Sequence, residues 1–585
     1  MSDASTAIEV ATWRKNVAIC AILIFILSAS CLTARGNSLT LYQAQTQDVP
    51  VLLILAVVIC GAMFAKTGLR LPARLPSNWA LLAAGAGIAG LITLGAIAIF
   101  ANYPLSRDEH MVVFDMAIYA KGQLAQPLPP VWRPYAGALV PDFLVNEKMP
   151  VGLVSGYLPV NAMLRLAFSK FANPIWFNPL LAVAGGWALL DIARREFGRD
   201  EKACWVVLLI YGLSAQMLIT AMTPFSVTAH MALNLVWLAM FLRGGKVGHA
   251  AAILVGFLAV GLHQLVFHPV FIAPFLLWRL RQGRWRVVLL YGVAYSLIVA
   301  WWAAYPLLLS VQSDPTIVQG LGESHREFLS ERVLPLLTHR TPGTMGLMVL
   351  NLLRFFAWQN AALLPLILAA VPVVRRCGGL PGSLLLGILL WLGIVGLVMP
   401  YQGLGWGYRY LGPYLGSFAL LAGYGYRELA VQWGDKADGL VIVPSVVSAF
   451  LMLPFLATTT RSFAQPYLAL EKLVGAQRSS FVVIDTAVSN PMDGSWARHP
   501  LDQVRNFADL RNQPIRVSGN RVNSAMIMHL CNIGPVTMLS REDMQRVGFM
   551  PNVPVVSSRF EAMRRTVDDR MPHCLRPAIV DFKGI

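Results

Sequence analysis

The chain has 585 residues, of which 56% are hydrophobic and only 13% are charged. Soluble proteins carry roughly 25% charged residues, so this composition excludes an ordinary cytosolic enzyme. The 47 basic and 30 acidic residues give a formal charge of +17. Most of the basic residues stand in short loops between apolar runs, and the sequence has no DNA- or RNA-binding module, so no nucleic-acid partner is expected.

Apolar runs long enough to cross roughly 30 Å of hydrocarbon recur between residues 16 and 456. They predict a polytopic α-helical membrane body over residues 1–459, with about thirteen transmembrane helices if the short run at Pro269 is counted. The first run lacks a small-residue cleavage site, so we interpret it as an uncleaved span. Residues 460–585 are polar enough to fold in water and predict a small α/β domain. The runs begin near Asn16, Val51, Trp79, Pro174, Ala203, Ser226, Gly248, Pro269, Arg286, Gln359, Gly382, Leu411 and Gly439.

The loops between these runs alternate between basic and weakly charged. The basic loops are cytoplasmic by the positive-inside rule. Residues 102–172, 310–343 and 460–585 then share the other side, so we expect a bacterial-type inner membrane protein with a cytoplasmic N-terminus and a periplasmic C-terminal domain. No GxxxxGK[ST] signature for ATP occurs in the sequence. An activated substrate or a gradient must therefore supply the driving force. The basic loops carry Lys66, Arg70, Arg74, Arg194, Arg195, Arg199, Lys202, Arg243, Lys246, Arg279, Arg281, Arg284, Arg286, Arg375 and Arg376.

The first large outer loop, 102–172, opens with helical apolar spacing that stops at Gly122. Asp108 and Asp115 are seven residues apart and therefore share one face of this helix. A carboxylate near an acceptor hydroxyl acts as a general base in group transfer, which makes Asp108 the candidate base. Ser106 and Glu109 also have the spacing of a capping box, so a structural role for the acidic pair is the alternative, and the two roles are compatible.

Further along the same loop, Glu147, Lys148 and Pro150 precede residues 151–171, which predict an amphipathic helix on the membrane surface. Lys148 is a candidate contact for an anionic head group. The alternative is a lysine that snorkels to the interface without a ligand.

This loop resembles that of the GT-C class of polyprenyl-phosphate-sugar-dependent glycosyltransferases, particularly the aminoarabinose lipid A transferases and the protein O-mannosyltransferases. The resemblance rests on Asp108 and Glu109 at the start of the loop and on Glu147-Lys148-Met149-Pro150-Val151, which is similar to the family's E-K-P-P-L stretch with one proline missing. Two spans precede the one that leads into the loop, where the family usually has one. The resemblance implies that Asp108 is the catalytic base, with Glu109 beside it.

A glycine-rich turn at residues 400–410 places Arg409 at the outer end of a span. The planar fork of arginine suits phosphate, so Arg409, with Tyr408 beside it, is the candidate for binding the carrier phosphate, together with Glu147 and Lys148. The alternative is an aromatic belt of Trp406, Tyr408 and Tyr410 with a snorkelling arginine.

Three histidines, His230, His263 and His268, stand at predicted outer ends of spans. Structural hydrogen bonding is favoured for them, and a divalent metal assembled across spans is possible. The middle loop, 310–343, has mixed charges typical of a cavity cover or of a solvated connection. Cys531 and Cys574 are the only cysteines of the C-terminal region and predict a disulfide on the oxidising side of the membrane.

The function that these patterns favour is an inverting membrane glycosyltransferase. It would move a sugar from a polyprenyl-phosphate carrier to lipid A, another envelope glycan or a protein, with no certain cofactor. A transporter or flippase of lipid-linked sugars is the alternative and would need charged or broken elements inside the membrane. A third interpretation, a ligase or polymerase that uses a diphosphate-linked glycan, would share Arg409 but not the acidic pair.

Overall fold

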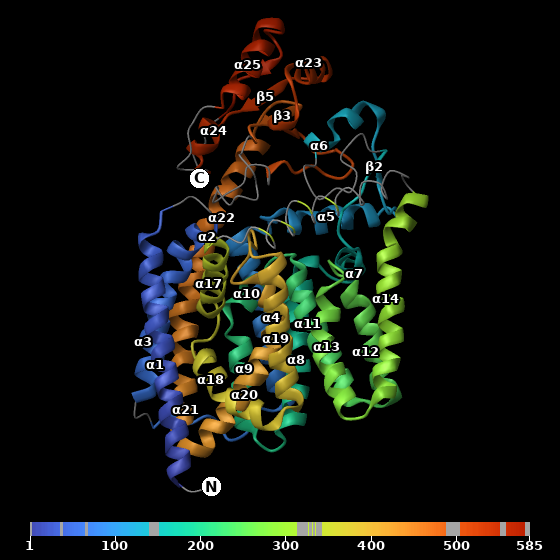
Figure 1. Ribbon diagram of the computed structural model, residues 1–585. Coiled ribbons are helices and arrows are strands. Elements are labelled where there is room, and N and C mark those ends of the chain that lie inside the picture. Colours follow the sequence, from blue (N-terminus) through green and yellow to red (C-terminus); the bar gives the residue numbers. More distant parts are fainter. Residues whose placement is uncertain are drawn as a thin grey trace.

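The computed structural model describes residues 3–35, 39–64, 68–139, 151–312, 342–486, 503–549 and 557–579, and four positions between 326 and 338. Glu147 and Lys148, and most of the middle loop, lie outside the described residues. The chain forms a tall bundle of helices with a smaller unit on one end (Figure 1). The N-terminus lies at the opposite end of the bundle from that unit.

The bundle is built from apolar helices that run roughly parallel to one another (Figure 1). Eight helices of the described residues are long and apolar enough to cross a membrane, or nine if α9 and α10, bent by 52°, are one span. Other bundle helices, such as the 16-residue α12, are shorter. The helices of the bundle are α1 (Asp3–Thr33), α2 (Leu39–Gln43), α3 (Val49–Phe64), α4 (Asn78–Phe100), α8 (Phe177–Phe197), α9 (Glu201–Gly212), α10 (Ala215–Ala221), α11 (Ser226–Arg243), α12 (Gly245–Val260), α13 (Phe267–Arg281), α14 (Trp285–Gln312), α17 (Pro342–Ala357), α18 (Leu363–Cys377), α19 (Gly379–Val398), α20 (Leu415–Trp433), α21 (Lys436–Val447) and α22 (Leu453–Gly475).

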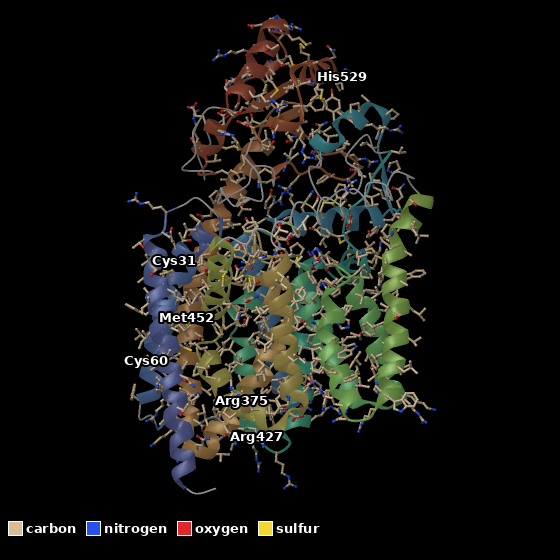
Figure 2. All side chains as sticks on the ribbon, in the orientation of Figure 1. Cys31, Cys60, Arg375, Arg427, Met452 and His529 are labelled. Carbon is tan, nitrogen blue, oxygen red and sulfur yellow. A yellow bond between two sulfur atoms is a disulfide. The ribbon has the colours of Figure 1, made fainter. Side chains whose placement is uncertain are left out.

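The side chains on the outer surface of the bundle differ from those in its interior, as expected for a bundle surrounded by lipid. Large apolar side chains such as Ile22, Leu289 and Leu297 are more than half exposed on its outer surface. Inside, small residues let helices approach closely. A Cβ on Gly425 of α20 would lie 1.9 Å from the carbonyl oxygen of Leu366 in α18, so only glycine permits this contact. Arg375 and Arg427 lie at the end of the bundle opposite the C-terminal unit (Figure 2).

Helix α5 (Arg107–Tyr119) lies across the end of the bundle that carries the C-terminal unit, here named the outer end, at a steep angle to the other helices (Figure 1). Ser106 and Glu109 form the predicted capping box at its start, and the chain turns at Gly122, whose φ is +70°. Next follow β1 (Gln126–Pro127), the 3₁₀ turn η2 (Pro130–Tyr135) and α6 (Ala136–Leu139). Strand β1 pairs antiparallel with β2 (Gly152–Leu153).

The helix predicted over 151–171 is shorter in the structure. Helix α7 covers Val160–Ser169 with Pro159 as its N-cap, while β2 and bends occupy the residues before it. Gly156 and Pro159 interrupt the apolar spacing, and a proline cannot supply an N–H inside a helix. The prediction was therefore wrong about where this helix begins.

The C-terminal unit is a small α/β layer. Its four strands are all parallel, in the order β4-β3-β5-β6, and they include the strand predicted at residues 481–484. Helix α22 continues through the predicted boundary at residue 459 and ends only a few residues before the first strand. The elements are β3 (Phe481–Ile484), β4 (Ile515–Ser518), α23 (Ser524–Ile533), β5 (Val536–Leu539), α24 (Arg541–Arg546), α25 (Ser558–Arg570) and β6 (Leu575–Arg576).

A disulfide joins Cys531 of α23 to Cys574, the residue before β6, across 43 positions of sequence. Their Cα atoms are 5.4 Å apart, which lies inside the range that a disulfide bridges. The bond ties the helix on one side of the sheet to its edge strand.

Candidate active site

Two predicted site residues, Asp108 and Arg409, meet at the outer end of the bundle although 301 positions separate them. Asp108 stands in the first turn of α5, and Arg409 begins the 3₁₀ turn η5 (Arg409–Tyr414) before α20. The Arg409 Nη1 lies 2.6 Å from Oδ2 of Asp108, and both side chains are more than four-fifths buried. The Tyr157 hydroxyl donates to the other carboxylate oxygen. The carboxylate therefore has a charged donor on one oxygen and a neutral donor on the other.

The turn that carries Arg409 is fixed by two glutamines. Gln402 accepts from the Arg409 backbone N–H at 2.9 Å and donates to the carbonyl of Gly407 at 3.1 Å. Gln216 of α10 donates to the carbonyl of Tyr408 at 2.8 Å. Gly407 has a φ of +66°, and a Cβ there would lie 2.7 Å from the Gln216 side chain, so this position needs glycine. These contacts fix the backbone of the turn and thereby the position of Arg409.

Tyr408 is not beside Asp108. Its side chain is fully buried in the bundle, where its hydroxyl lies 3.9 Å from the sulfur of Met348. Its backbone carbonyl is the group that helps to hold the turn. The neighbour of the guanidinium is instead the ring of Tyr410, with the Arg409 Cζ 5.3 Å from its centroid.

The charge state of Asp108 follows from opposing effects. Burial raises the pKa of a carboxyl group, but the Arg409 guanidinium, then His263 and the Tyr157 hydroxyl, together hold the pKa of Asp108 below its usual range. Asp108 is therefore ionised at neutral pH. While Arg409 stays paired with it, the carboxylate is a weak base.

Asp108 borders a small cavity of about 10 Å³, roughly the space that one water molecule needs. A second carboxyl, Asp115, borders the same cavity from two turns further along α5. Polar side chains from other elements complete the lining, and apolar residues fill the remainder. The polar lining comprises Asp108, Asp115, Tyr157, Asn161, Ser226 and His263.

The three histidines make different contacts, and the two buried ring nitrogens of His230 have no hydrogen-bond partner among the described residues. His263 stacks on Tyr157 with ring centroids 4.3 Å apart, and burial lowers its pKa to about 4, so it is neutral. His268 pairs with Asn234 and Tyr295, each at 2.8 Å. His230 packs edge-on against Phe267. Across the part of the chain that the structure describes, no three His, Cys, Asp or Glu side chains are placed to hold a metal ion.

Glu109 faces away from the cavity, because adjacent residues of a helix point about 100° apart. Its Oε2 accepts from the backbone N–H groups of Leu105 at 2.5 Å and Ser106 at 3.0 Å. Burial raises the pKa of Glu109 to about 7. In this arrangement Glu109 holds the start of the helix that presents Asp108.

The C-terminal unit also contacts the residues that precede α5. Arg505 donates to the carbonyl of Leu105 at 2.5 Å and lies over the ring of Tyr103, 4.7 Å from its centroid. Both contacts lie within five residues of Asp108. The C-terminal unit therefore takes part in fixing the position of the candidate base.

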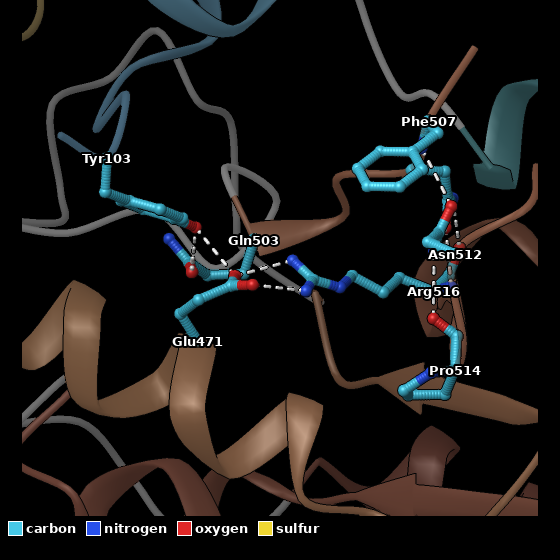
Figure 3. A network of polar contacts seen from close by, with 8 residues as sticks. Tyr103, Glu471, Gln503, Phe507, Asn512, Pro514 and Arg516 are labelled. Carbon is cyan, nitrogen blue, oxygen red and sulfur yellow. Dashed lines mark hydrogen bonds and ion pairs between the residues drawn. The ribbon is translucent and has the colours of Figure 1, made fainter.

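A second ion pair joins this unit to the bundle (Figure 3). Glu471 of α22 receives two hydrogen bonds from Arg516 of β4, at 2.6 and 2.5 Å, and a third from the Tyr103 hydroxyl at 3.0 Å. Tyr103 also bonds Gln503 at 3.2 Å. Sequence reasoning missed Tyr103, Tyr157, Glu471, Arg505 and Arg516, because none of them stands in a motif. The one signal in the sequence that could have indicated them is the occurrence of charged and phenolic side chains next to a span.

No protein-family model matches the sequence, and no curated protein matches it either. Solved structures do match. The crystal structure of ArnT from Cupriavidus metallidurans bound to undecaprenyl phosphate aligns with a TM-score of 0.52 at 12% identity, over 83% of this chain and 97% of that one. The apo-state crystal structure of the same protein aligns at 0.49 and 11%, over 82% and 97%. This likeness confirms the resemblance predicted from the first outer loop: the chain is a polytopic α-helical protein with the GT-C fold of ArnT.

Proposed function

We propose that this protein is a membrane glycosyltransferase that moves a sugar from a polyprenyl-phosphate carrier to an acceptor of the cell envelope. The observation that carries the proposal is the ion pair of Asp108 and Arg409 beside a cavity at the outer end of the bundle. The fold is that of a protein crystallised with undecaprenyl phosphate, which supports a carrier of this chemical class. The acceptor is a lipid A or other envelope glycan, or a protein.

The proposed first step is an exchange of partners at Arg409. A carrier phosphate is a doubly hydrogen-bonding anion that matches the planar guanidinium fork at least as well as a carboxylate does. As Arg409 turns to the phosphate, Asp108 loses its largest stabilising charge, and its pKa rises toward the usual range. Binding of the donor thereby converts a weak base into a stronger one.

The second step is a single displacement. Asp108 takes the proton of the acceptor hydroxyl, and the acceptor oxygen forms a bond to the anomeric carbon of the sugar. The bond between that carbon and the phosphate oxygen breaks, and the polyprenyl phosphate leaves with both electrons, held by Arg409. One displacement inverts the anomeric centre. Glu147 and Lys148 remain proposed contacts of the phosphate, as the family resemblance implies.

The proposed location is an inner membrane, with the reaction on its periplasmic face. Arg375, in the last turn of α18, and Arg427 of α20 lie at the end of the bundle opposite α5 and the C-terminal unit (Figure 2), which supports a cytoplasmic N-terminus. Residues such as Leu289 and Leu297 supply the surface for membrane lipids.

Transport of a lipid-linked sugar is the second candidate, because Asp48 and Arg354 form a buried charged pair within the bundle. Asp48 is the last residue of a π-helical turn, η1 (Ala44–Asp48), and Trp358 donates to it at 2.7 Å. However, Arg354 also donates to the carbonyl of Gly405 at 2.8 Å, in the turn that carries Arg409. We therefore interpret the pair as support for this turn.

Reconstitution of the full chain in liposomes separates the two functions. A fluorescent polyprenyl phosphate-sugar is supplied on the C-terminal-domain side with an envelope-lipid extract as acceptor. A glycosyltransferase forms a glycosylated acceptor and releases polyprenyl phosphate without moving the probe between leaflets. Asp191→Asn is the matched control, because Asp191 is a partly exposed carboxylate of α8 that pairs with Arg195 and does not border the cavity. Movement of the probe without product formation would overturn the proposal in favour of transport.

A further inference from the structure

The cavity beside Asp108 has a second polar end that proton abstraction and phosphate binding do not use. Asp115 lies seven residues after Asp108, so the two Cα atoms are roughly 10 Å apart along α5 and face the same way. Asp115 is 3% exposed. A buried carboxyl costs stability unless it has partners, and its side-chain contact is a hydrogen bond from Ser155. Burial raises the pKa of Asp115 well above its usual range, which favours the protonated form of this carboxyl.

The opposite wall contributes a polar atom without a partner. Asn161 of α7 is 3% exposed and borders the cavity. Its amide nitrogen makes one long hydrogen bond, 3.4 Å, to the carbonyl of Pro224, and its Oδ1 has no hydrogen-bond partner among the described residues. A buried amide oxygen without a partner is unfavourable, so such a group is a candidate to accept a hydrogen bond from a ligand or a water.

The chemistry of this end of the cavity fits a neutral hydroxyl group. A protonated carboxyl offers a donor and an acceptor, and the amide oxygen of Asn161 offers an acceptor. The neighbouring His263 is neutral, and no lysine or arginine borders the cavity among the described residues, so a second phosphate is disfavoured. The volume of about 10 Å³ accommodates one oxygen atom with its hydrogen.

We propose that Asp115 and Asn161 form a sugar subsite that binds one hydroxyl group of a sugar while its reacting centre lies at Asp108. This inference rests on the proposed function, since it assigns a role to the far end of the same cavity. The hydroxyl belongs either to the sugar of the donor or to a sugar of the acceptor, and the two sources are distinguished by which affinity changes.

The test compares a carrier with and without its sugar. Full-length protein in lipid nanodiscs is titrated with undecaprenyl phosphate, and then with undecaprenyl phosphate-mannose, -glucose and -arabinose. Wild type should bind at least one sugar-bearing lipid more tightly than the bare carrier. Asp115→Leu and Asn161→Leu should each reduce that gain by about 10-fold and leave the affinity for the bare carrier unchanged.

Two further measurements exclude a merely structural role. Asp115→Asn keeps a donor and an acceptor and should retain most of the gain. Asp115→Leu should unfold at the same temperature as wild type or higher, because it removes a buried carboxyl group. Val113→Ala is the control on the same helix, since Val113 is 42% exposed on its outer face.

The outcomes separate the two proposals. If the gain persists in the leucine variants but the KM for the acceptor rises about 10-fold, the hydroxyl belongs to the acceptor. If neither quantity changes, or if Asp115→Leu only lowers the unfolding temperature, the subsite is wrong while the proposed function stands. If wild type binds no carrier at all, the proposed function itself fails.

Discussion

Two partly buried ion pairs stand near the outer end of the bundle, and they differ in what surrounds them. Glu471 and Arg516 are joined by two hydrogen bonds, and Tyr103 adds a third (Figure 3). Arg409 contacts one carboxylate oxygen of Asp108 at 2.6 Å, Tyr157 donates to the other, and a cavity lies beside the carboxylate. The first pair has both of its carboxylate oxygens occupied by the fork of the arginine. The second borders a space of about one water molecule, which suits a hydroxyl group.

The difference teaches how a structural ion pair is told from a functional one in the same molecule. A bidentate pair that bridges α22 and β4 fixes one unit on another, and removing it should cost stability. A pair beside a cavity exchanges partners when a ligand arrives, and removing it should cost activity. Substitutions at the two pairs should therefore have different consequences for transfer and for stability.

Asp108→Asn should lower transfer by roughly 10²- to 10⁴-fold, because the amide keeps the size of the carboxylate but accepts no proton. The unfolding temperature should change little, since the amide oxygen still accepts from Arg409 or Tyr157. Initial rates in proteoliposomes together with thermal unfolding in detergent provide the measurement. Transfer close to wild type would move the base to another carboxyl, with Glu109 and Asp115 as the next candidates.

Arg409→Lys should weaken the use of the donor by roughly 10- to 100-fold, because a lysine offers a point charge in place of the bidentate fork. The apparent KM for the polyprenyl phosphate-sugar should rise more than kcat falls. Donor titration at saturating acceptor measures the split. An unchanged donor KM would favour the alternative in which Arg409 only belongs to an aromatic belt.

Glu471→Leu should destabilise the contact between the C-terminal unit and the bundle by about 1–3 kcal/mol, because it leaves Arg516 without its partner. Transfer should fall less than 10-fold, as a consequence of a less firmly held α5. Limited proteolysis and thermal unfolding report the first effect, and initial rates the second. A loss of transfer as large as that of Asp108→Asn, at unchanged stability, would erase the contrast between the two ion pairs.

Glu109→Gln should retain transfer within about 3-fold, since glutamine also serves in a capping box. Its effect is on the pH dependence of stability. The pKa of Glu109 is raised to about 7 in the folded chain, so its contribution is fully present below its usual pKa and is lost as the pH rises through 7. The variant should therefore have a flatter profile of unfolding temperature between about pH 4.5 and 7. A profile identical to that of wild type would refute this account of Glu109.

The smallest effect on transfer is expected for Cys531→Ser with Cys574→Ser. The cross-link closes a 43-position separation, and its loss should destabilise the C-terminal unit by about 3–4 kcal/mol in the chain-entropy model. Mass spectrometry of non-reduced peptides from the native protein should find the two cysteines joined. Rapid labelling of both by a membrane-impermeant thiol reagent from outside would exclude the bond, and labelling only from the cytoplasmic side would invert the proposed topology.

Much of the fold was predictable, because its signals are local. Apolar runs predict helices, and the spacing of Ser106 and Glu109 predicts the start of α5. The end of the bundle was harder to locate. Polar residues such as Thr458 and Arg461 resemble the end of a span, yet α22 continues to Gly475, because its last turns are covered by the C-terminal unit.

The site was predicted in its parts but not in its assembly. Asp108 and Arg409 each stand in a recognisable local pattern, whereas their contact across 301 positions depends on how the helices pack. Tyr157 and Arg505 reach Asp108 and Leu105 only through tertiary structure. Tyr408 was assigned to the phosphate with Arg409 because it is adjacent in sequence, but neighbours in a tight turn point in different directions.

The most direct test of the exchange at Arg409 is a cryo-EM structure of the full chain in lipid nanodiscs with undecaprenyl phosphate. We expect carrier phosphate oxygens within hydrogen-bond distance of the Arg409 guanidinium, with Asp108 separated from it and open to the cavity. A carrier phosphate bound elsewhere, with the pair of Asp108 and Arg409 intact, would contradict the account.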